Sequence, residues 1–512
     1  INNFIIKCGI IVMIKALRNR SIIKSTALFL ISFLVGCDNF LDEIPDNRVE
    51  LNDIEKAAQL VTNAYSSASP GFTDWLSDDV SWTRGTNIRP NQGLLYLWED
   101  DLSDPTEPDS PTSFWFSTYD AIAHANEVLA VIDELPATTE EELAQQRAIK
   151  GEALLARAYG HFMLVNLFGQ HFQAQGSSSN LGIPYISEPE TEFIVSYERS
   201  SVRRVYDRVE DDLLEGLDLI DDSFFANSGK YHFNRNAALA FASRFYLFKR
   251  DFIRCVQYSD ELLNSDPSAF VRDMTSEEFQ IAKSSIAGYP QLYNSPDLPA
   301  NLLLMRKISL IQRTDIAFGP SRTFYGSLFA SHPFVGATDE RENPALVKGD
   351  NALYPLRYEG LFERSSLNSN TGLPYHIAPI FRGEEVLLNR AEANVFLGNI
   401  ESAMSDLQIL TNNRYRGGEL TLTAELLRNF FGAEDDPSFI VEDILLNYII
   451  LERRKEFIAQ GMRWFDIKRY GISVTHDLED GSVVELRGDD LRKALQIPQS
   501  AVDVGGLEPN RR

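Results

Sequence analysis

The stretch from Leu451 to Gly471, LERRKEFIAQGMRWFDIKRYG, constrains the fold of this chain more than any other part of its sequence. At 100° per residue, its apolar side chains fall on one side of a helix. Arg454 lies in the middle of that side, and because an unpaired buried charge is costly, we expect a carboxylate opposite it. The candidates for that carboxylate belong to one predicted helix: Glu384, Glu385 and Glu392.

Gly461 interrupts this stretch. A glycine at such a place either allows another backbone to approach closely or ends the helix. In the second case, the run from Arg463 to Asp466 would begin the next element. The stretch is therefore predicted to be structural rather than an active site, with Arg454, Gly461 and Asp466 as its main residues.

The N-terminus predicts the cellular compartment. A basic region from Lys15 to Lys24 precedes an apolar run from Ala27 to Val35, which is the layout of a secretory signal. Leu34-Val-Gly-Cys37 fits a bacterial lipobox, so we predict that residues 1–36 are removed and that Cys37 carries the lipid anchor. The apolar run is too short to span a bilayer, and a short buried helix is the alternative.

The residues on either side of this signal extend the prediction. A start at Met13, just before the basic region, would leave residues 1–12 outside the protein. Residues 37–52, which are rich in Asp, Glu and Asn, are predicted to form an extended tether. Cys255 is the one cysteine in the sequence after Cys37, so no disulfide is expected within the exported part.

Long amphipathic helices are predicted over most of the remaining chain. Apolar residues three and four positions apart mark them at 53–67, 115–133, 140–168 and 201–220. Two later helical pairs, at 236–267 and 386–410, have small residues at the spacing of the tetratricopeptide repeat, where helices cross. The predicted fold class is therefore all-α, with ordinary helical hairpins as the alternative to repeats.

Two segments, 71–112 and 284–376, lack helical periodicity and are rich in aromatic and turn-forming residues. Segments this long without regular structure are uncommon in compact domains unless they serve a function. Aromatic faces beside amide and guanidinium donors suit a sugar, which has apolar C–H faces and hydroxyl groups. We therefore predict a sugar-binding site with these candidates: Trp82, Arg84, Asn87, Arg89, Tyr289 and Tyr325.

Another interpretation of the same aromatic residues is that they only hold loops against the helical core. Three of the five tryptophans, Trp75, Trp82 and Trp98, lie in the first irregular segment. Trp75 and Trp98 are nearer to helical sequence and are predicted to be core residues. Trp82 is the tryptophan for which we predict contact with the ligand.

The sequence contains no recognisable catalytic or cofactor motif. Its seven histidines are scattered, and it has no HExxH or CxxC metal spacing, no G-x-S-x-G, no Walker loop and no dinucleotide fingerprint. We therefore predict no cofactor, no metal site and no enzymatic activity. The net charge of −26 disfavours nucleic acid as a partner, because Lys and Arg supply most of the affinity for phosphates.

The chain resembles the SusD/RagB family, surface lipoproteins of glycan-degrading bacteria, in several motifs that follow the family's order. An ERR-type helix, then Gly461, Arg463-Trp-Phe-Asp466 and Arg469-x-Gly471, is similar to the family's C-terminal signature. The other segments that resemble the family are 151–159, 166–169, 181–185, 385–393, 497–500 and 507–510. Ala501 departs from the pattern, since the family has an acidic residue there.

The resemblance implies a tetratricopeptide-like helical scaffold with long irregular ligand-binding loops. It also implies that the protein captures oligosaccharides at the outer membrane and delivers them to a TonB-dependent transporter. Peptide capture, known for part of the family, is the alternative, followed by a glycoside hydrolase and a scaffold without a ligand. The expected organisation is a signal (1–36), a tether (37–52), an N-terminal helical part (53–283), an irregular insert (284–376) and a C-terminal helical part (377–512).

Overall fold

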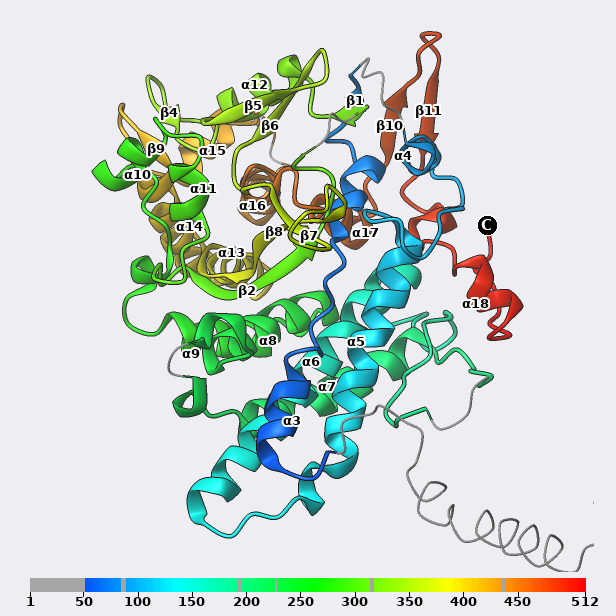
Figure 1. The fold of residues 1–512 in the computed structure, drawn as a ribbon. Helices are drawn as coiled ribbons and strands as arrows, with labels where there is room; N and C mark the ends of the chain where they lie inside the picture. The colour runs from blue at the N-terminus through cyan, green and yellow to red at the C-terminus, as the bar shows by residue number, and fades with distance from the viewer. Residues whose placement is uncertain are drawn as a thin grey trace, which may run out of the picture. The chain divides into compact units, whose positions relative to one another are not determined.

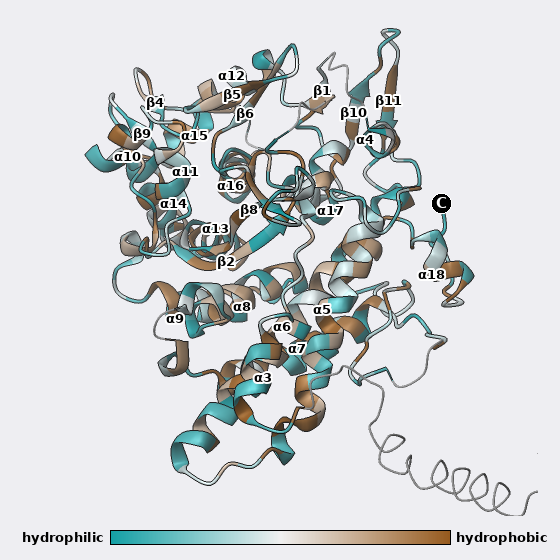
Figure 2. Cartoon of the chain, viewed as in Figure 1, coloured by the Kyte–Doolittle hydropathy of each residue, from teal (hydrophilic) through white to brown (hydrophobic). Residues whose placement is uncertain are grey.

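The helix α6 (Glu140–Phe168) is central to the N-terminal half and packs against α5 (Pro111–Val131) and α7 (Val202–Leu219) (Figure 1). It begins with a capping box, in which the Thr139 hydroxyl and the Glu142 carboxylate each accept a hydrogen bond from the other residue's backbone N–H. Its first turn is acidic, and most of its residues from Gln146 onward are buried. Figure 2 shows this change from a hydrophilic start to a more hydrophobic course.

The computed structural model describes residues 51–83, 89–190, 195–225, 228–313, 317–433, 436 and 438–512. Within these ranges, the chain from Asn52 to Arg512 packs as one unit. Cys37 and the predicted signal lie outside the described residues. Among the helices that the structure does describe, none combines the length and the apolar character that crossing a membrane requires.

The helices predicted at 115–133, 140–168 and 201–220 are confirmed as α5, α6 and α7, whereas the one predicted at 53–67 is shorter. This helix, α3 (Ile54–Val61), is followed by an extended segment in which the carbonyl of Ser67 accepts a hydrogen bond from the N–H of Ile308. The long-range pairing therefore replaces the last helical turns. The shorter helices are α4 (Pro90–Tyr96), α10 (Glu277–Ala282), α11 (Gly288–Tyr293), α12 (Arg322–Ala330), α15 (Ala424–Phe430) and α18 (Gln499–Asp503).

Two helical hairpins form where the repeats were predicted: α8 (Arg235–Lys249) with α9 (Phe252–Leu263), and α13 (Gly383–Phe396) with α14 (Ile400–Arg414). Small side chains lie at the crossings. The hydroxyl oxygens of Ser243 and Ser259 are 2.8 Å apart, and Ala391 is fully buried. Because α9 also packs against α13, the hairpins stack on one another. The predicted helical, tetratricopeptide-like scaffold is confirmed.

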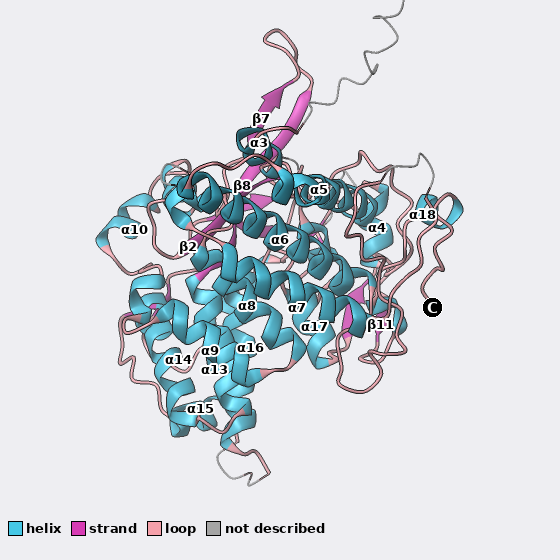
Figure 3. Cartoon of the chain, turned by 90° about the horizontal axis from the view of Figure 1, so that it is seen from below, coloured by secondary structure: helices cyan, strands magenta, loops and turns pink. Residues whose placement is uncertain are grey.

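The insert at 284–376 contains strands as well as short helices, so the prediction of an irregular segment is wrong in part. β8 (Gly372–Arg382) pairs on one side with β2 (Asn301–Ile308) and on the other with β7 (Leu361–Arg364), all antiparallel. Figure 3 shows β7 and the start of β8 projecting beyond the helices. β2 is buried along most of its length, so its sequence lacks the alternation that marks a half-buried strand.

The remaining strands form short antiparallel pairs, each joining two segments of the chain. These pairs are β1 (Ser81–Trp82) with β3 (Phe318–Gly319), β4 (Thr338–Asp339) with β9 (Tyr415–Arg416), β5 (Ala345–Lys348) with β6 (Ala352–Pro355), and β10 (Val474–Asp477) with β11 (Val483–Leu486).

The stretch from Leu451 to Gly471 belongs to two helices, α16 (Val441–Phe457) and α17 (Arg463–Tyr470). Gly461 lies between them with φ of +76°. A Cβ atom on this residue would be 2.5 Å from the carbonyl oxygen of Pro70. Both predicted roles of Gly461 are therefore present, since the helix has ended and another backbone approaches closely.

Arg454 is paired with carboxylates as predicted, but the predicted partners on α13 are wrong. Its Nε donates to Asp79 at 2.5 Å, its guanidinium lies 3.2 Å from Asp78, and its side chain is 20% exposed. The helical projection failed because α16 ends at Phe457, so the apolar residues after it do not continue the same face.

The arginine that faces α13 is Arg453, whose side chain is fully buried. It donates to Asn389 at 2.9 Å and to Asp466 at 3.1 Å. The three carboxylates proposed for Arg454 have other partners: Glu384 pairs with Arg272 and Arg414, Glu385 with Arg244, and Glu392 with Arg469.

Candidate functional site

Trp82 lies in β1, where it is held opposite Phe318 of β3 and is half-buried. The backbone N–H of Thr83 donates to the carbonyl of Ala317 at 2.8 Å and extends this pairing by one residue. The insert therefore fixes the backbone of Trp82 while its side chain keeps contact with solvent. Arg84 and Asn87, its predicted companions, lie outside the described residues.

Four stacked rings lie beside this strand pair. Tyr96 of α4 stacks on Phe318 with the ring centroids 4.2 Å apart, and His476 of β10 also stacks on Tyr96, at 4.0 Å between centroids. Trp98 follows at 4.4 Å from His476. We call Phe318, Tyr96, His476 and Trp98 the aromatic column, and it gives the pair β1–β3 a rigid support.

Polar contacts hold the aromatic column in place. The His476 ring nitrogens lie 2.7 Å from the carbonyl of Tyr96 and 2.8 Å from that of Ser77, and burial lowers the pKa of this histidine. The indole N–H of Trp98 donates to the carbonyl of Leu76 at 2.9 Å. Sequence analysis did not identify this column, because its members come from segments that only the fold brings together.

The residues just before β1 are tied to α16 and α17. Asp78 accepts two hydrogen bonds from Arg463, at 2.8 and 2.9 Å, and Asp79 pairs with Arg454. Burial alone would raise the pKa of Asp78, but the guanidiniums of Arg463 and Arg454 lower it below its usual value. For Asp79, the effect of burial exceeds the opposing effect of the Arg454 guanidinium, so its pKa is raised. These ion pairs fix the entry into β1.

Phe324 of α12 is a half-buried aromatic residue that the guanidinium of Arg454 covers at 4.8 Å from its ring centroid. Because Arg454 also binds Asp79, it links α12 to the residues that precede Trp82. Trp82 and Phe324 thus belong to neighbouring parts of one supported region. We refer to Trp82, Phe324 and the aromatic column as the candidate site.

The other candidates from the sequence lie deeper. Arg89 is half-buried, 3.5 Å from Asp109 and 5.5 Å from the ring centroid of Trp75, which is itself buried as predicted. Tyr289 and Tyr325 are 2% and 0% exposed, and the Tyr325 hydroxyl donates to the carbonyl of Glu342. Neither tyrosine offers a ring face to a ligand, because the insert folds these rings inward, and neither belongs to the candidate site.

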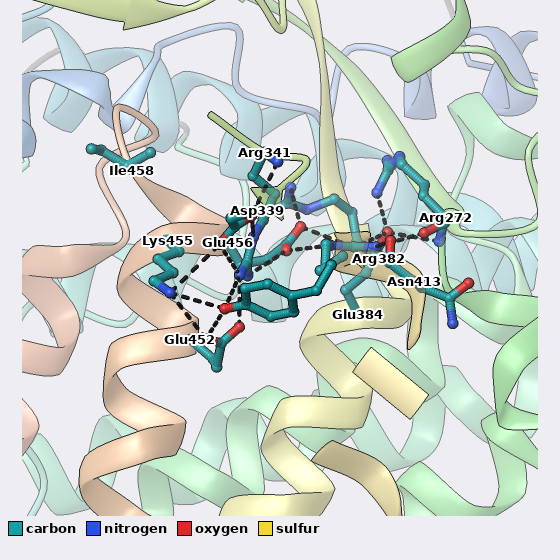
Figure 4. A network of polar contacts seen from close by, with 12 residues as sticks. Arg272, Asp339, Arg341, Arg382, Glu384, Asn413, Glu452, Lys455, Glu456 and Ile458 are labelled. Carbon is teal, nitrogen blue, oxygen red and sulfur yellow. Dashed lines mark hydrogen bonds and ion pairs between the residues drawn. The ribbon is translucent and has the colours of Figure 1, made fainter. Parts of the chain in front are cut away.

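A buried network of charged side chains is the arrangement that most resembles a catalytic centre (Figure 4). Glu456 and Glu384 both pair with Arg414, while Asp339 and Glu452 both pair with Arg341. Burial alone would raise the pKa of Glu456, but the arginines lower it well below its usual range, so it stays ionised. Paired, ionised and buried carboxylates of this kind join α13 and α16 to the insert rather than transfer protons to a substrate.

The structure also has a surface groove of about 720 Å³ between α5, residues near Ile186 and α18. Trp115, Tyr119 and Leu507 contribute apolar surface, and Asp120, Glu188 and Glu190 are its charged residues. In the part of the chain that the structure describes, no group of His, Cys, Asp and Glu side chains is arranged to hold a metal ion.

Comparison with protein families gives two matches that together cover most of the chain. Residues 39–247 match a family described as "Starch-binding associating with outer membrane". Residues 364–500 match the model described as "SusD family". A SusD-like protein from Formosa agariphila is 23% identical over 497 residues, which cover 87% of this chain and 91% of the relative.

Solved structures show the same fold. A SusD superfamily protein from Bacteroides thetaiotaomicron superposes with a TM-score of 0.64 at 21% identity, covering 90% of this chain and 100% of the other. A putative sugar binding protein from Bacteroides vulgatus gives 0.66 at 19% identity, covering 90% and 99%. A laminarin binding SusD-like protein gives 0.57 at 18% identity, covering 89% and 98%.

Proposed function

This chain belongs to the SusD/RagB family, and on that basis we propose that it captures oligosaccharides at the cell surface through Trp82. The observation that supports this proposal is the position of the Trp82 ring. Its backbone is fixed by β3, it lies beside a rigid aromatic column, and the residue is partly exposed. A fixed and accessible aromatic face is suited to stacking on a sugar ring.

Hydrogen bonds to the sugar hydroxyls would come from residues next to Trp82 in the sequence. We propose Arg84 and Asn87, two and five positions after Trp82, as the guanidinium and amide donors. Phe324 is the aromatic residue of the insert that we propose in place of Tyr289 and Tyr325. The relative described as laminarin binding is consistent with a glycan ligand.

The proposed cellular role follows from the family and the N-terminus. Cys37 would carry lipid after removal of residues 1–36, and residues 37–52 would connect the anchor to the folded part. The bound glycan would then pass to a TonB-dependent outer-membrane transporter. The protein would act as a binding protein, without enzymatic activity, cofactor or metal.

Calorimetric titration of oligosaccharides into wild type and Trp82→Ala tests the proposal. Stacking by one aromatic ring contributes about 0.5–1.5 kcal/mol beyond the burial of the ring, so the variant should bind about tenfold more weakly with little change in thermal stability. Tyr231→Ala removes another exposed aromatic ring, 44% accessible, and serves as the matched control. Unchanged affinity in Trp82→Ala would place the site elsewhere. Cleavage of the oligosaccharide by the purified protein during the titration would contradict a pure binding protein.

Peptide capture is the second candidate, and the groove beside α5 favours it. Its charged residues are Asp120, Glu188 and Glu190, and no basic residue is among the described residues that line it. Apolar surface with carboxylates suits a peptide that has both apolar and cationic side chains. Including basic peptides in the titration distinguishes the two, because a peptide bound in this groove would be insensitive to Trp82→Ala.

A further inference from the structure

A small cavity of about 70 Å³ lies among α6, the strands β2 and β8, and the turn after α16. Tyr159 lines it from α6, Lys307 from β2, His376 from β8 and Ala459 from the turn. Lys307 and His376 are directly opposite each other in the antiparallel pair, so their side chains share one face of the sheet. None of these residues belongs to the candidate site described above.

Lys307 is a buried cation without a matching anion. It is 4% exposed, and its Nζ donates to the carbonyl of Ser66 at 2.6 Å. No carboxylate of the described residues forms an ion pair with it, and burial lowers its pKa to about 7. Lys468 is also buried, but its Nζ donates to three carbonyls at the end of α6.

His376 adds an unsatisfied polar group beside Lys307. It is 5% exposed, and its Nδ1 has no hydrogen-bond partner among the described residues. Tyr358 stacks on one face of the imidazole with centroids 4.6 Å apart, which fixes the ring plane. Burial lowers the pKa of His376 to about 3, so the ring is neutral and still has one N–H to donate.

The remaining charges around the cavity do not neutralise Lys307. Arg244 is satisfied by a bidentate pair with Glu385, which is the one carboxylate among the lining residues. Arg382 donates to the hydroxyl of Tyr293 and lies 3.9 Å from Glu456. The cavity therefore has an excess of positive charge and hydrogen-bond donors, which is an environment suited to an anion.

We propose that this cavity binds a small carboxylate, such as formate or acetate, between Lys307 and His376. The volume limits the ligand, because 70 Å³ corresponds to only about two water molecules in the liquid. A one- or two-carbon carboxylate fits this space, whereas a sugar does not. The anion would supply the missing partner for Nζ of Lys307 and accept the imidazole N–H.

The proposal has a distinctive proton signature. At pH 8, Lys307 with a pKa of about 7 is mostly neutral, and a bound carboxylate would favour its charged form. Binding should therefore take up about one proton at pH 8 and almost none at pH 6, where the amine is already protonated. Arg244 and Arg382 keep their charges over this range, because neighbouring groups raise the pKa of each guanidinium, and they contribute nothing to the uptake.

The test is calorimetric titration of formate and acetate into the purified protein, at ionic strength held constant with chloride. Repeating it at pH 8 in buffers of different ionisation enthalpy measures the proton uptake. We expect one saturable site with uptake near one proton at pH 8. The absence of saturable binding, or binding without proton uptake at pH 8, would overturn the proposal, and equal binding of the larger sulfate would overturn the assignment to a small carboxylate.

Two variants assign the binding to Lys307. Lys307→Met should abolish the saturable heat, and His376→Gln should weaken binding at least about tenfold while preserving proton uptake. Lys493→Met is the matched control, because Lys493 is also buried but donates to the carbonyls of Ile472 and Gly488 away from the cavity. Full binding by Lys307→Met would contradict the proposal. If Lys307→Met does not fold, the proton uptake of the wild type and the affinity of His376→Gln still test the proposal.

Discussion

The backbone N–H of Gly461 donates a hydrogen bond to the carboxylate of Asp74 at 2.8 Å, across 387 residues of sequence. The hydroxyl of Thr73 returns a hydrogen bond to the carbonyl of Gly461 at 2.6 Å. The turn between α16 and α17 is thus bound to the segment that leads into Trp82. The C-terminal signature of the family supports the N-terminal part of the candidate site.

Replacing Gly461 by alanine should destabilise the fold through a steric contact. Gly398→Ala is the matched control, because both glycines have φ of +76° but a Cβ at Gly398 meets nothing within 4 Å. The backbone strain, about 1–2 kcal/mol, is common to both. We expect Gly461→Ala to lose about 1–3 kcal/mol more than the control in urea unfolding, because its Cβ overlaps the Pro70 carbonyl. Equal losses would show that the turn adjusts.

Arg453→Ala should be among the most destabilising substitutions in α16. It removes one of the two arginines that pair with the buried Asp466, the other being Arg469, and leaves the side-chain oxygen of Asn389 without its donor, at a cost of about 1–3 kcal/mol. Arg487→Ala breaks an exposed pair with Asp489 and should change the free energy of unfolding by less than about 1 kcal/mol. Chemical denaturation compares the two, and similar small effects would refute a structural role for Arg453.

Asp466 should make the stability of the protein depend on pH in the acid range. Burial alone would raise the pKa of Asp466, but the guanidiniums of Arg453 and Arg469 lower it below its usual value. A lowered folded-state pKa stabilises the fold above the unfolded pKa of about 3.9, and this contribution is lost as the pH falls through the folded pKa.

Asp466→Asn should therefore cost more stability at pH 7 than at pH 3. Asp489→Asn changes an exposed carboxylate, with 78% of its side chain accessible, and is the control for a general effect of charge. Urea unfolding at the two pH values measures both differences. A penalty for Asp466→Asn that does not shrink on acidification would mean that the carboxylate is not the stabilising form.

Cys37→Ala should prevent attachment of lipid, because the thiol of the lipobox is the group that receives it. Labelled fatty acid supplied to cells should enter the wild type and not the variant, and the variant should leave the membrane fraction or retain residues 1–36. Cys255→Ala is the control, since Cys255 is buried in α9. Equal labelling of Cys37→Ala would refute the lipoprotein prediction.

Local sequence signals predicted the helices better than the site. The bounds of α6 were predicted correctly from the spacing of its apolar residues, and its start is fixed in the structure by a capping box of Thr139 and Glu142. Arg454 was assigned to the wrong partners because the end of α16 at Phe457 shifts every later side chain off the projected face. The aromatic column was not predicted, because stacking of Tyr96 on Phe318 and His476 depends on three segments that meet only in the folded chain.

The two-residue pairing of Trp82 with Phe318 has a consequence for attempts to change the ligand. Because β3 belongs to the insert, the segment that carries Trp82 and the insert determine each other's position. Transplanting either one alone from a relative would bring a strand without its partner, and the tryptophan would lose its orientation. Selectivity for the ligand should therefore transfer between relatives only when both segments are exchanged together.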